Sequence, residues 1–158
     1  MHVHDACIAG EGELRVAALG LFTVASLHGP DEMARGELMR FLAEAAWYPT
    51  ALLPSQGVRW QAVDEHSANA VLDDEGISVT LLFHFDDAGL VDRVSAKARG
   101  ATVGETVVMT PWQATIWNYQ ERGGMRIPLD GEAAWLQPQG PKPYWRGRIA
   151  SLAYEFAA

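Results

Sequence analysis

One histidine, one carboxylate and one tyrosine have the chemistry needed for general acid–base catalysis. His84 lies in the middle of an alternating apolar segment, on the same side as Ser78 and Thr80. If that side lines a cavity, His84 is a candidate general base, with Asp92 or Tyr119 beside it. If that side faces solvent, His84 is an ordinary strand residue, which is the simpler interpretation.

A second group of side chains is suited to binding a ligand. Tryptophan and tyrosine rings offer apolar surface with an orienting N–H or O–H donor, and arginine can hold a carboxylate or phosphate through its planar fork. The same residues also suit an ordinary core, with the arginines stacked on tryptophan or paired with surface acids such as Glu132. The candidate ligand-binding residues are Trp60, Trp112, Trp117, Tyr119, Trp135, Trp145, Arg126 and Arg146.

The N-terminal histidines and the single cysteine are weak candidates for a metal site or a nucleophile. His2 and His4 would face the same side of a strand, but no third ligand accompanies them. Cys7 is the only cysteine, so there is no internal disulfide, and a lone cysteine usually packs as a small apolar residue. No metal ion and no cofactor are predicted.

Composition and missing motifs exclude several classes of function. The chain has 20 acidic and 12 basic residues and a net charge of -8, which disfavours nucleic acid as a partner. It contains no glycine-rich phosphate loop, no G-x-S-x-G and no H-E-x-x-H. Neither a signal peptide nor an apolar run of about 20 residues is present, so we expect no membrane span and, by default, a cytoplasmic location.

The first part of the sequence predicts two strands and one helix. Residues 2–9 and 13–27 are rich in apolar residues around Gly10-Glu11-Gly12, which favours a hairpin. Pro30 and the acids that follow it are typical of a helix start, and the spacing predicts a helix over 30–47 that Pro49 ends. Its apolar face would carry Leu38, Phe41, Leu42 and Ala45.

After position 58 the apolar residues alternate, which predicts strands. In residues 77–86, Val79, Leu81 and Phe83 point one way while the residues between them point the other. Short links between successive strands favour antiparallel pairing. We therefore predict a single mainly β domain over 1–158, a curved antiparallel sheet or half-barrel meander with one packed helix. Its later strands lie near 58–64, 67–73, 77–86, 90–98, 105–119, 125–136 and 144–156.

Three long motifs resemble those of an uncharacterised bacterial family, a domain of unknown function. They are WYPTALLPSQGVRW at 47–60, TPW at 110–112 with GMRIP at 124–128, and PYWRGRI at 143–149. The resemblance covers essentially the whole chain.

The order of the predicted elements also resembles the half-barrel of bacterial lipoprotein carriers of the LolA and LolB kind. This second resemblance concerns the fold alone. It implies a sheet curled round an apolar cavity that holds an acyl chain or another hydrophobic ligand.

These observations leave three hypotheses about function. The first is a binding domain, without catalysis, for a hydrophobic small molecule or acyl chain in an apolar cavity. The second is an enzyme that uses His84, Asp92 and Tyr119 for acid–base chemistry in the same cavity. The third is a structural module that forms a homodimer through its exposed sheet edges.

Overall fold

Antiparallel strands around one α-helix make up the described part of the chain. The computed structural model describes residues 2–8, 11–18, 22–27, 30–104 and 106–154, with side chains described for Glu32 and from Ala34 onward. The elements are β1 (His2–Ile8), β2 (Glu11–Ala18), β3 (Phe22–Leu27), α1 (Pro30–Glu44), η1 (Ala45–Trp47), η2 (Pro49–Leu52), η3 (Pro54–Gln56), β4 (Arg59–Asp64), β5 (Ser67–Asp74), β6 (Ile77–Phe85), β7 (Val91–Val103), β8 (Thr106–Arg122), β9 (Met125–Gln137) and β10 (Gly140–Arg148). The predicted mainly β class with one packed helix is confirmed.

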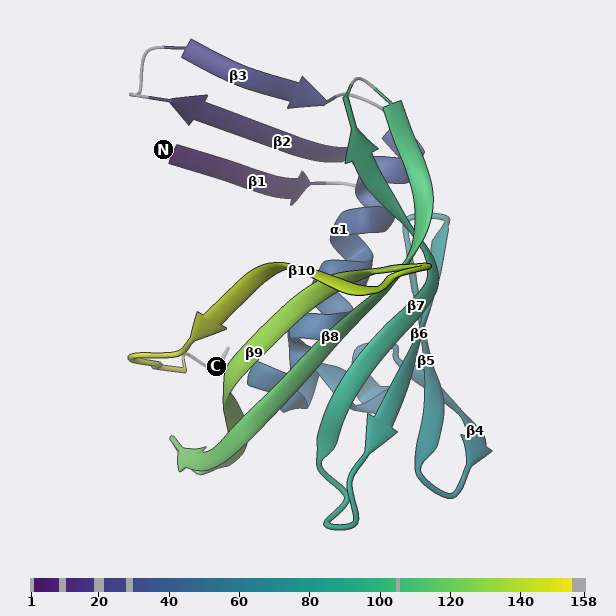
Figure 1. Ribbon diagram of the computed structural model, residues 1–158. Coiled ribbons are helices and arrows are strands. Elements are labelled where there is room, and N and C mark those ends of the chain that lie inside the picture. The colour runs from purple at the N-terminus through teal and green to yellow at the C-terminus, as the bar shows by residue number, and fades with distance from the viewer. Residues whose placement is uncertain (1, 9–10, 19–21, 28–29, 105, 155–158) are drawn as a thin grey trace.

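Strands β4–β10 form a single antiparallel meander. Their order in the sheet is β10-β9-β8-β7-β6-β5-β4, so every strand pairs with its neighbours in sequence. The sheet is not closed, and β4 and β10 are its two edges. It bends so that α1 lies in its hollow (Figure 1). We call the side that packs against α1 the inner face and the opposite side the outer face.

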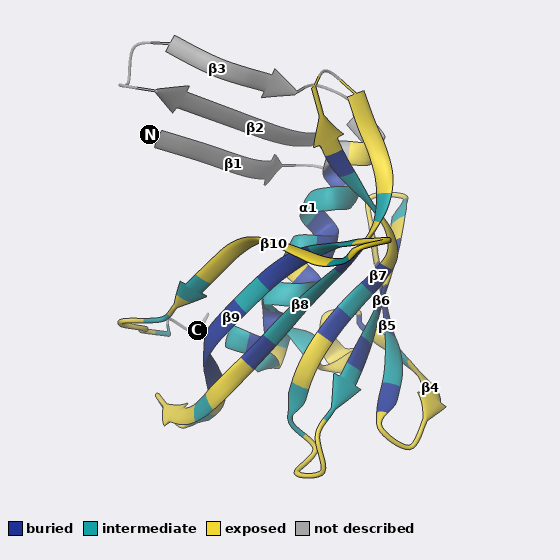
Figure 2. Cartoon of the chain, viewed as in Figure 1, coloured by how far each residue is buried: buried dark blue, intermediate teal, exposed yellow. Residues whose placement is uncertain are grey.

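The alternation predicted for β6 is confirmed. Val79, Leu81 and Phe83 are fully or almost fully buried on the inner face and belong to the main core. From α1, the core takes Leu38, Met39 and Leu42, as the dark bands of helix and sheet indicate (Figure 2). Burial of apolar surface between one helix and one sheet face is therefore the main stabilising contribution to this part of the fold.

Helix α1 begins at Pro30 as predicted but ends at Glu44, three residues earlier than expected. The chain then continues as the 3-10 turn η1 up to Trp47, and Pro49 begins a second such turn. Phe41, which we expected on the apolar face, is nearly half exposed and packs against Tyr48, with ring centroids 5.7 Å apart. The apolar face of the helix is thus narrower than its sequence suggests.

The N-terminal segment forms three strands and not the predicted two. β1, β2 and β3 make a separate antiparallel sheet in that order. Residues 13–27, predicted as one strand, are divided between β2 and β3. β2 and β3 pair antiparallel with each other, so the chain reverses its direction between Ala18 and Phe22.

The last strand also differs from the prediction. β10 begins at Gly140 and ends at Arg148, whereas the sequence suggested a strand over 144–156. Gln137 and Gly140 are paired, so only Pro138 and Gln139 separate β9 from β10, and Gly140 adopts a positive φ of 115°. This hairpin is tighter than the predicted strand bounds of 125–136 and 144–156 implied.

Candidate functional site

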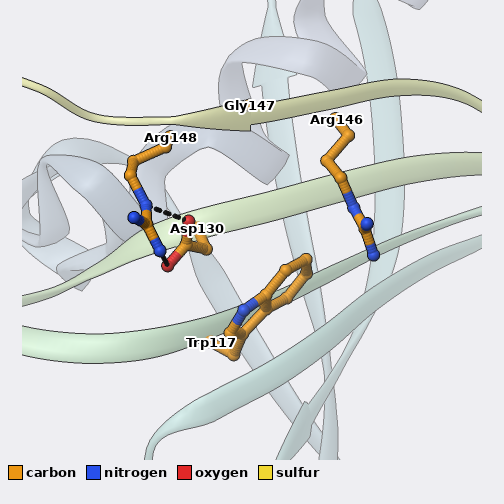
Figure 3. Close-up of a pocket in the computed structure, with 5 residues that line it drawn as sticks. All are labelled: Trp117, Asp130, Arg146, Gly147 and Arg148. Atoms are coloured by element: carbon orange, nitrogen blue, oxygen red, sulfur yellow. Dashed lines mark hydrogen bonds and ion pairs between the residues drawn. The ribbon is translucent and has the colours of Figure 1, made fainter.

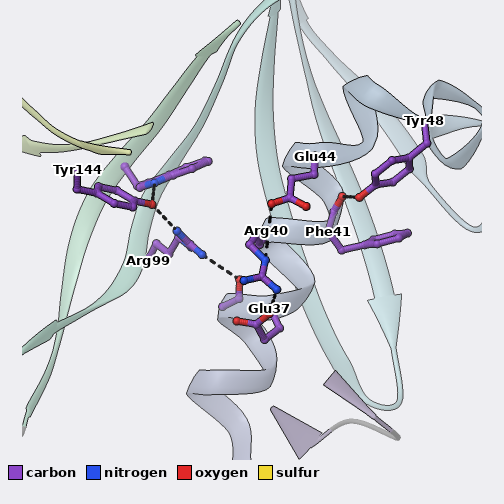
Figure 4. A network of polar contacts seen from close by, with 9 residues as sticks. Glu37, Arg40, Phe41, Glu44, Tyr48, Arg99 and Tyr144 are labelled. Carbon is purple, nitrogen blue, oxygen red and sulfur yellow. Dashed lines mark hydrogen bonds and ion pairs between the residues drawn. The ribbon is translucent and has the colours of Figure 1, made fainter. Parts of the chain in front are cut away.

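On the inner face, one arginine lies among three aromatic side chains. The guanidinium carbon of Arg99 lies 5.0 Å from the ring centroid of Trp112 and 5.9 Å from that of Trp135. Tyr144 stacks on Trp135 with centroids 5.3 Å apart. The Tyr144 hydroxyl oxygen accepts hydrogen bonds from Arg99 Nη1 at 3.1 Å and from Trp112 Nε1 at 2.9 Å (Figure 4). These four residues, the inner cluster, come from the four adjacent strands β7–β10.

Two strand irregularities bring the inner cluster together. The β7–β8 register shifts between Ala96, which is in the core, and Arg99. In a regular strand a residue three positions after Ala96 would face outward, so the extra residue of the bulge turns Arg99 back to the inner face. A second shift between Pro143 and Trp145 allows Tyr144 and Trp145, although consecutive, both to pack against inner-face aromatic rings.

Helix α1 faces the inner cluster with charged side chains. Arg99 Nη2 donates to the carbonyl of Gly36 at 3.3 Å, and Arg40 pairs with both Glu37 and Glu44. Burial raises the pKa values of the Glu37 and Glu44 carboxyl groups, and the positive charge of Arg99 opposes this shift in both. Within the described residues Arg99 Nε is buried without a hydrogen-bond partner, so the cluster retains one unused donor.

A second aromatic pair, formed between β10 and η1, lies on the inner face. Trp145 on β10 faces Trp47 of η1, with ring centroids 6.1 Å apart. A Cβ atom on Gly131 of β9 would lie 3.4 Å from the Trp145 ring and 3.6 Å from the Trp47 ring, so both indoles lie over this glycine at ordinary van der Waals distance. Trp47 Nε1 is another buried donor that has no partner in the described part of the chain.

The outer face carries an open pocket of about 530 Å³ (Figure 3). Ile116 and Gly131 are a cross-strand pair on the inner face, so the next pair, Trp117 and Asp130, faces outward. Arg146 and Arg148 of β10 are opposite the outward-facing Glu132 and Asp130 of β9. The residues that line this outer pocket are Trp117, Asp130, Arg146, Gly147 and Arg148.

Ion pairs hold the side chains of the outer pocket. Arg148 forms a fork on Asp130, from Nε to Oδ1 at 2.6 Å and from Nη2 to Oδ2 at 3.1 Å. Asn118 Nδ2 also donates to Asp130 Oδ2, at 2.6 Å. Arg146 Nε lies 3.1 Å from Glu132 Oε2, and its guanidinium carbon lies 5.6 Å from the Trp117 ring centroid. Both partners that the sequence suggested for Arg146, a surface acid and a tryptophan face, are confirmed.

Hydrogen bonds from Arg148 and Asn118 hold the pKa of the Asp130 carboxyl below its usual value of 3.8. We therefore expect Asp130→Asn to lower the thermal unfolding midpoint near neutral pH. Since the folded-state pKa lies below that of the unfolded chain, this stabilisation is present above the unfolded pKa and is lost as pH falls through the folded pKa.

The difference in midpoint between Asp130→Asn and the parent should thus shrink at pH values below about 4. Circular dichroism melts between about pH 7 and about pH 2.5 measure it, with Asp87→Asn in the exposed β6–β7 loop as the control. A difference that stays constant over this range would contradict the expectation.

The candidate ligand-binding residues divide between the two faces of the sheet. Trp112, Trp135 and Trp145 lie on the inner face, whereas Trp117 and Arg146 line the outer pocket. Trp60 is partly buried, packs edge-on against Phe83 of the core at 5.2 Å, and donates from Nε1 to the carbonyl of Leu52. Arg126 is exposed and lies opposite Glu121 in the register of β8 and β9.

The three candidate catalytic residues lie outside both groups. The Tyr119 hydroxyl donates to the carbonyl of Val91 at 2.7 Å, and burial raises its pKa. Burial, together with the charge of Arg93, lowers the pKa of His84. The charge of Asp92 is a smaller influence that raises the pKa of both His84 and Tyr119.

Sequence reasoning missed Arg99 and Asp130. Regular alternation gives no reason to place Arg99 inward, because the bulge before it has no sequence signature. Asp130 did carry a signal, since an acid within an apolar strand segment needs a partner, and the following strand offers Arg148 at matching parity.

Some predictions concern features that the structure describes only in part. The side chains of His2, His4 and Cys7 lie outside the described ones. Among the described residues, no three histidine, cysteine or acidic side chains are grouped so that they could hold a metal ion. In the same part of the chain, no helix combines the length and the apolar character needed to cross a membrane.

The fold and these two groups of side chains define an open antiparallel β-domain packed on one helix. The chain belongs to a family of unknown function, DUF6920, whose model matches residues 1–154. The resemblance of the three sequence motifs to a family of unknown function is thereby confirmed. No curated protein and no solved structure matches the chain. None of the comparisons points to the lipoprotein carriers.

Proposed function

We propose that the domain binds a hydrophobic small molecule or acyl chain on the inner face of its sheet, without catalysing a reaction. The observation that carries the proposal is the inner cluster, in which Arg99 is held against Trp112 and Trp135. A partly buried cation between aromatic rings is costly unless it contributes to function or to packing, and this one keeps an unused donor at Nε.

The cluster offers both parts that an amphiphilic ligand needs. Tyr144 and Trp145 leave about half of their surface exposed on the inner side of β10, which gives an apolar chain two rings to lie against. Arg99 supplies a positive charge for an acidic head group at the helix end of this surface. The ligand that fits this combination best is a fatty acid or a similar apolar monocarboxylate.

Charged side chains of α1 lie close to Arg99. Burial raises the pKa values of the Glu37 and Glu44 carboxyl groups, and the charge of Arg99 acts on both. Arg40 of the helix lies between Glu37 and Glu44 and adds a positive charge to that of Arg99 on β7. Because Arg40 is already paired, Arg99 should dominate the attraction.

The test is a titration of the purified protein with dodecanoate, followed by tryptophan fluorescence and by native mass spectrometry. We expect saturable binding, and binding that is weakened about tenfold or more in Arg99→Met, which keeps the apolar stem but removes the charge. Dodecanol should bind the parent and Arg99→Met equally, because it has no acidic group. Arg122→Gln, an exposed arginine at the far end of β8, is the matched control and should bind dodecanoate as the parent does.

Two outcomes would overturn the proposal. One is the absence of saturable dodecanoate binding to a folded parent protein. The other is equal dodecanoate affinity of the parent and Arg99→Met, provided that circular dichroism shows the variant to be folded.

A further inference from the structure

We propose that the outer pocket binds a small planar oxyanion, of which an aromatic carboxylate is the simplest case. The pocket lies on the opposite side of the sheet from the inner cluster, so this inference is independent of acyl binding on the inner face. Its volume of about 530 Å³ suits a small ligand, since pockets for small molecules usually measure about 300–1,000 Å³.

The outer pocket exposes donors and covers acceptors. The side chains of Arg146 and Arg148 are 71% and 70% exposed, whereas those of their partners Glu132 and Asp130 are only 27% and 9% exposed. A molecule that enters from solvent therefore meets guanidinium N–H groups before it meets a carboxylate. These exposed N–H donors favour an oxyanion as the ligand, although each arginine–carboxylate pair is neutral as a whole.

Arg148 is held ready for such a ligand. Its Nε and Nη2 donate to Asp130, and Asp130 in turn is fixed by Asn118. Nη1 takes no part in this fork and makes no hydrogen bond within the described part of the chain, so its N–H groups are available to a ligand. Because the fork already restricts the side chain, binding there loses less conformational entropy than binding to a free arginine.

The spacing of the two arginines matches a single anion. Arg146 and Arg148 alternate on β10, so they project to the same face with their Cα atoms roughly 7 Å apart. Trp117 lies beside them on the floor of the pocket, and its ring is partly exposed (Figure 3). A flat ring can stack on Trp117 while its carboxylate reaches the guanidinium groups, which is why a planar ligand fits better than a bulky one.

Isothermal titration calorimetry with benzoate tests the proposal. We expect saturable binding with a Kd in the millimolar range or below, which weakens as salt is added. Benzamide tests the charge and cyclohexanecarboxylate tests the planarity, and each should bind about tenfold more weakly or not at all. Phenyl phosphate distinguishes the head group, because tighter binding than benzoate would identify phosphate as the preferred oxyanion.

Two variants test whether benzoate binds at the outer pocket. Arg146→Gln removes one charge and Trp117→Leu removes the flat surface, and each should weaken benzoate binding about tenfold or more. Arg122→Gln should leave it unchanged, and so should Arg99→Met on the inner face, which separates this proposal from acyl binding. Both pocket positions are partly exposed, and thermal melts confirm that the variants fold.

Three results would overturn the inference. These are no saturable benzoate binding to the folded parent, unchanged affinity in folded Arg146→Gln and Trp117→Leu, and affinity for benzamide or cyclohexanecarboxylate equal to that for benzoate.

Discussion

Phe83→Ala is expected to lower the free energy of unfolding by about 3–5 kcal/mol. Phe83 of β6 is fully buried in the core on the inner face, and its ring meets Trp60 edge-on at 5.2 Å. Alanine would remove this contact and leave a cavity between β6 and α1 that the neighbouring side chains fill only in part. A domain of this size is typically stable by about 5–15 kcal/mol, so the variant would lose a large share of its stability.

Urea unfolding followed by circular dichroism measures this loss. Phe41→Ala is the matched control, because it removes the same atoms from a ring that is 44% exposed, and it should cost much less. Phe83→Leu, which keeps most of the buried volume, should fall between the two. Equal losses in Phe83→Ala and Phe41→Ala would show that Phe83 does not lie at the centre of the core.

The sheet could be predicted from sequence wherever one face is buried and the other is not. In β6 we expected Val79, Leu81 and Phe83 to face inward, and all three do. Side chains alternate between the two faces of a strand, so packing one face against a helix fixes which residues are buried. Pro30 likewise marked the start of α1, since its fixed φ and missing N–H suit only the first turn of a helix.

Prediction failed where the regular period breaks. The bulge before Arg99 and the shift at Tyr144 each change which residues face α1. Neither Lys97 nor Ala98 distinguishes the β7 bulge from a regular strand, whereas Pro143, which borders the shift in β10, is a residue type that often marks a bulge. The predicted extent of the apolar helix face was also wrong at Phe41, whose helical spacing is correct but whose ring packs on Tyr48 and stays exposed. The local pattern predicts which face of a helix or strand carries a residue. It does not predict how far the surface extends against which that face packs.

The same limit explains why the candidate binding residues did not form one site. Trp112 and Trp117 are five positions apart on β8, so their parity already assigns them to opposite faces of a regular strand. Composition alone suggested one aromatic cavity, whereas the strand geometry makes two groups of different chemistry. The inner cluster is mainly aromatic around one cation, and the outer pocket contains two ion pairs beside one ring.

Gly147→Ala is expected to lower the free energy of unfolding by about 1–3 kcal/mol. A Cβ atom on Gly147 would lie 2.5 Å from Cζ2 and 2.8 Å from Cη2 of the Trp145 ring, well inside the normal carbon–carbon separation of about 3.5–4.0 Å. The indole would have to leave its place against Trp47 and Gly131. Gly36→Ala is the control, because a Cβ there meets nothing within 4 Å and alanine favours a helix by about 1 kcal/mol.

A double-mutant cycle separates this steric effect from a general effect of glycine replacement. In Trp145→Ala the ring that blocks the new methyl group is gone, and alanine is better suited than glycine to the interior of a strand. Gly147→Ala should therefore cost nothing, or stabilise slightly, when it is added to Trp145→Ala. An equal loss of stability with and without Trp145 would mean that the backbone of β10, and not the indole, requires glycine at this position.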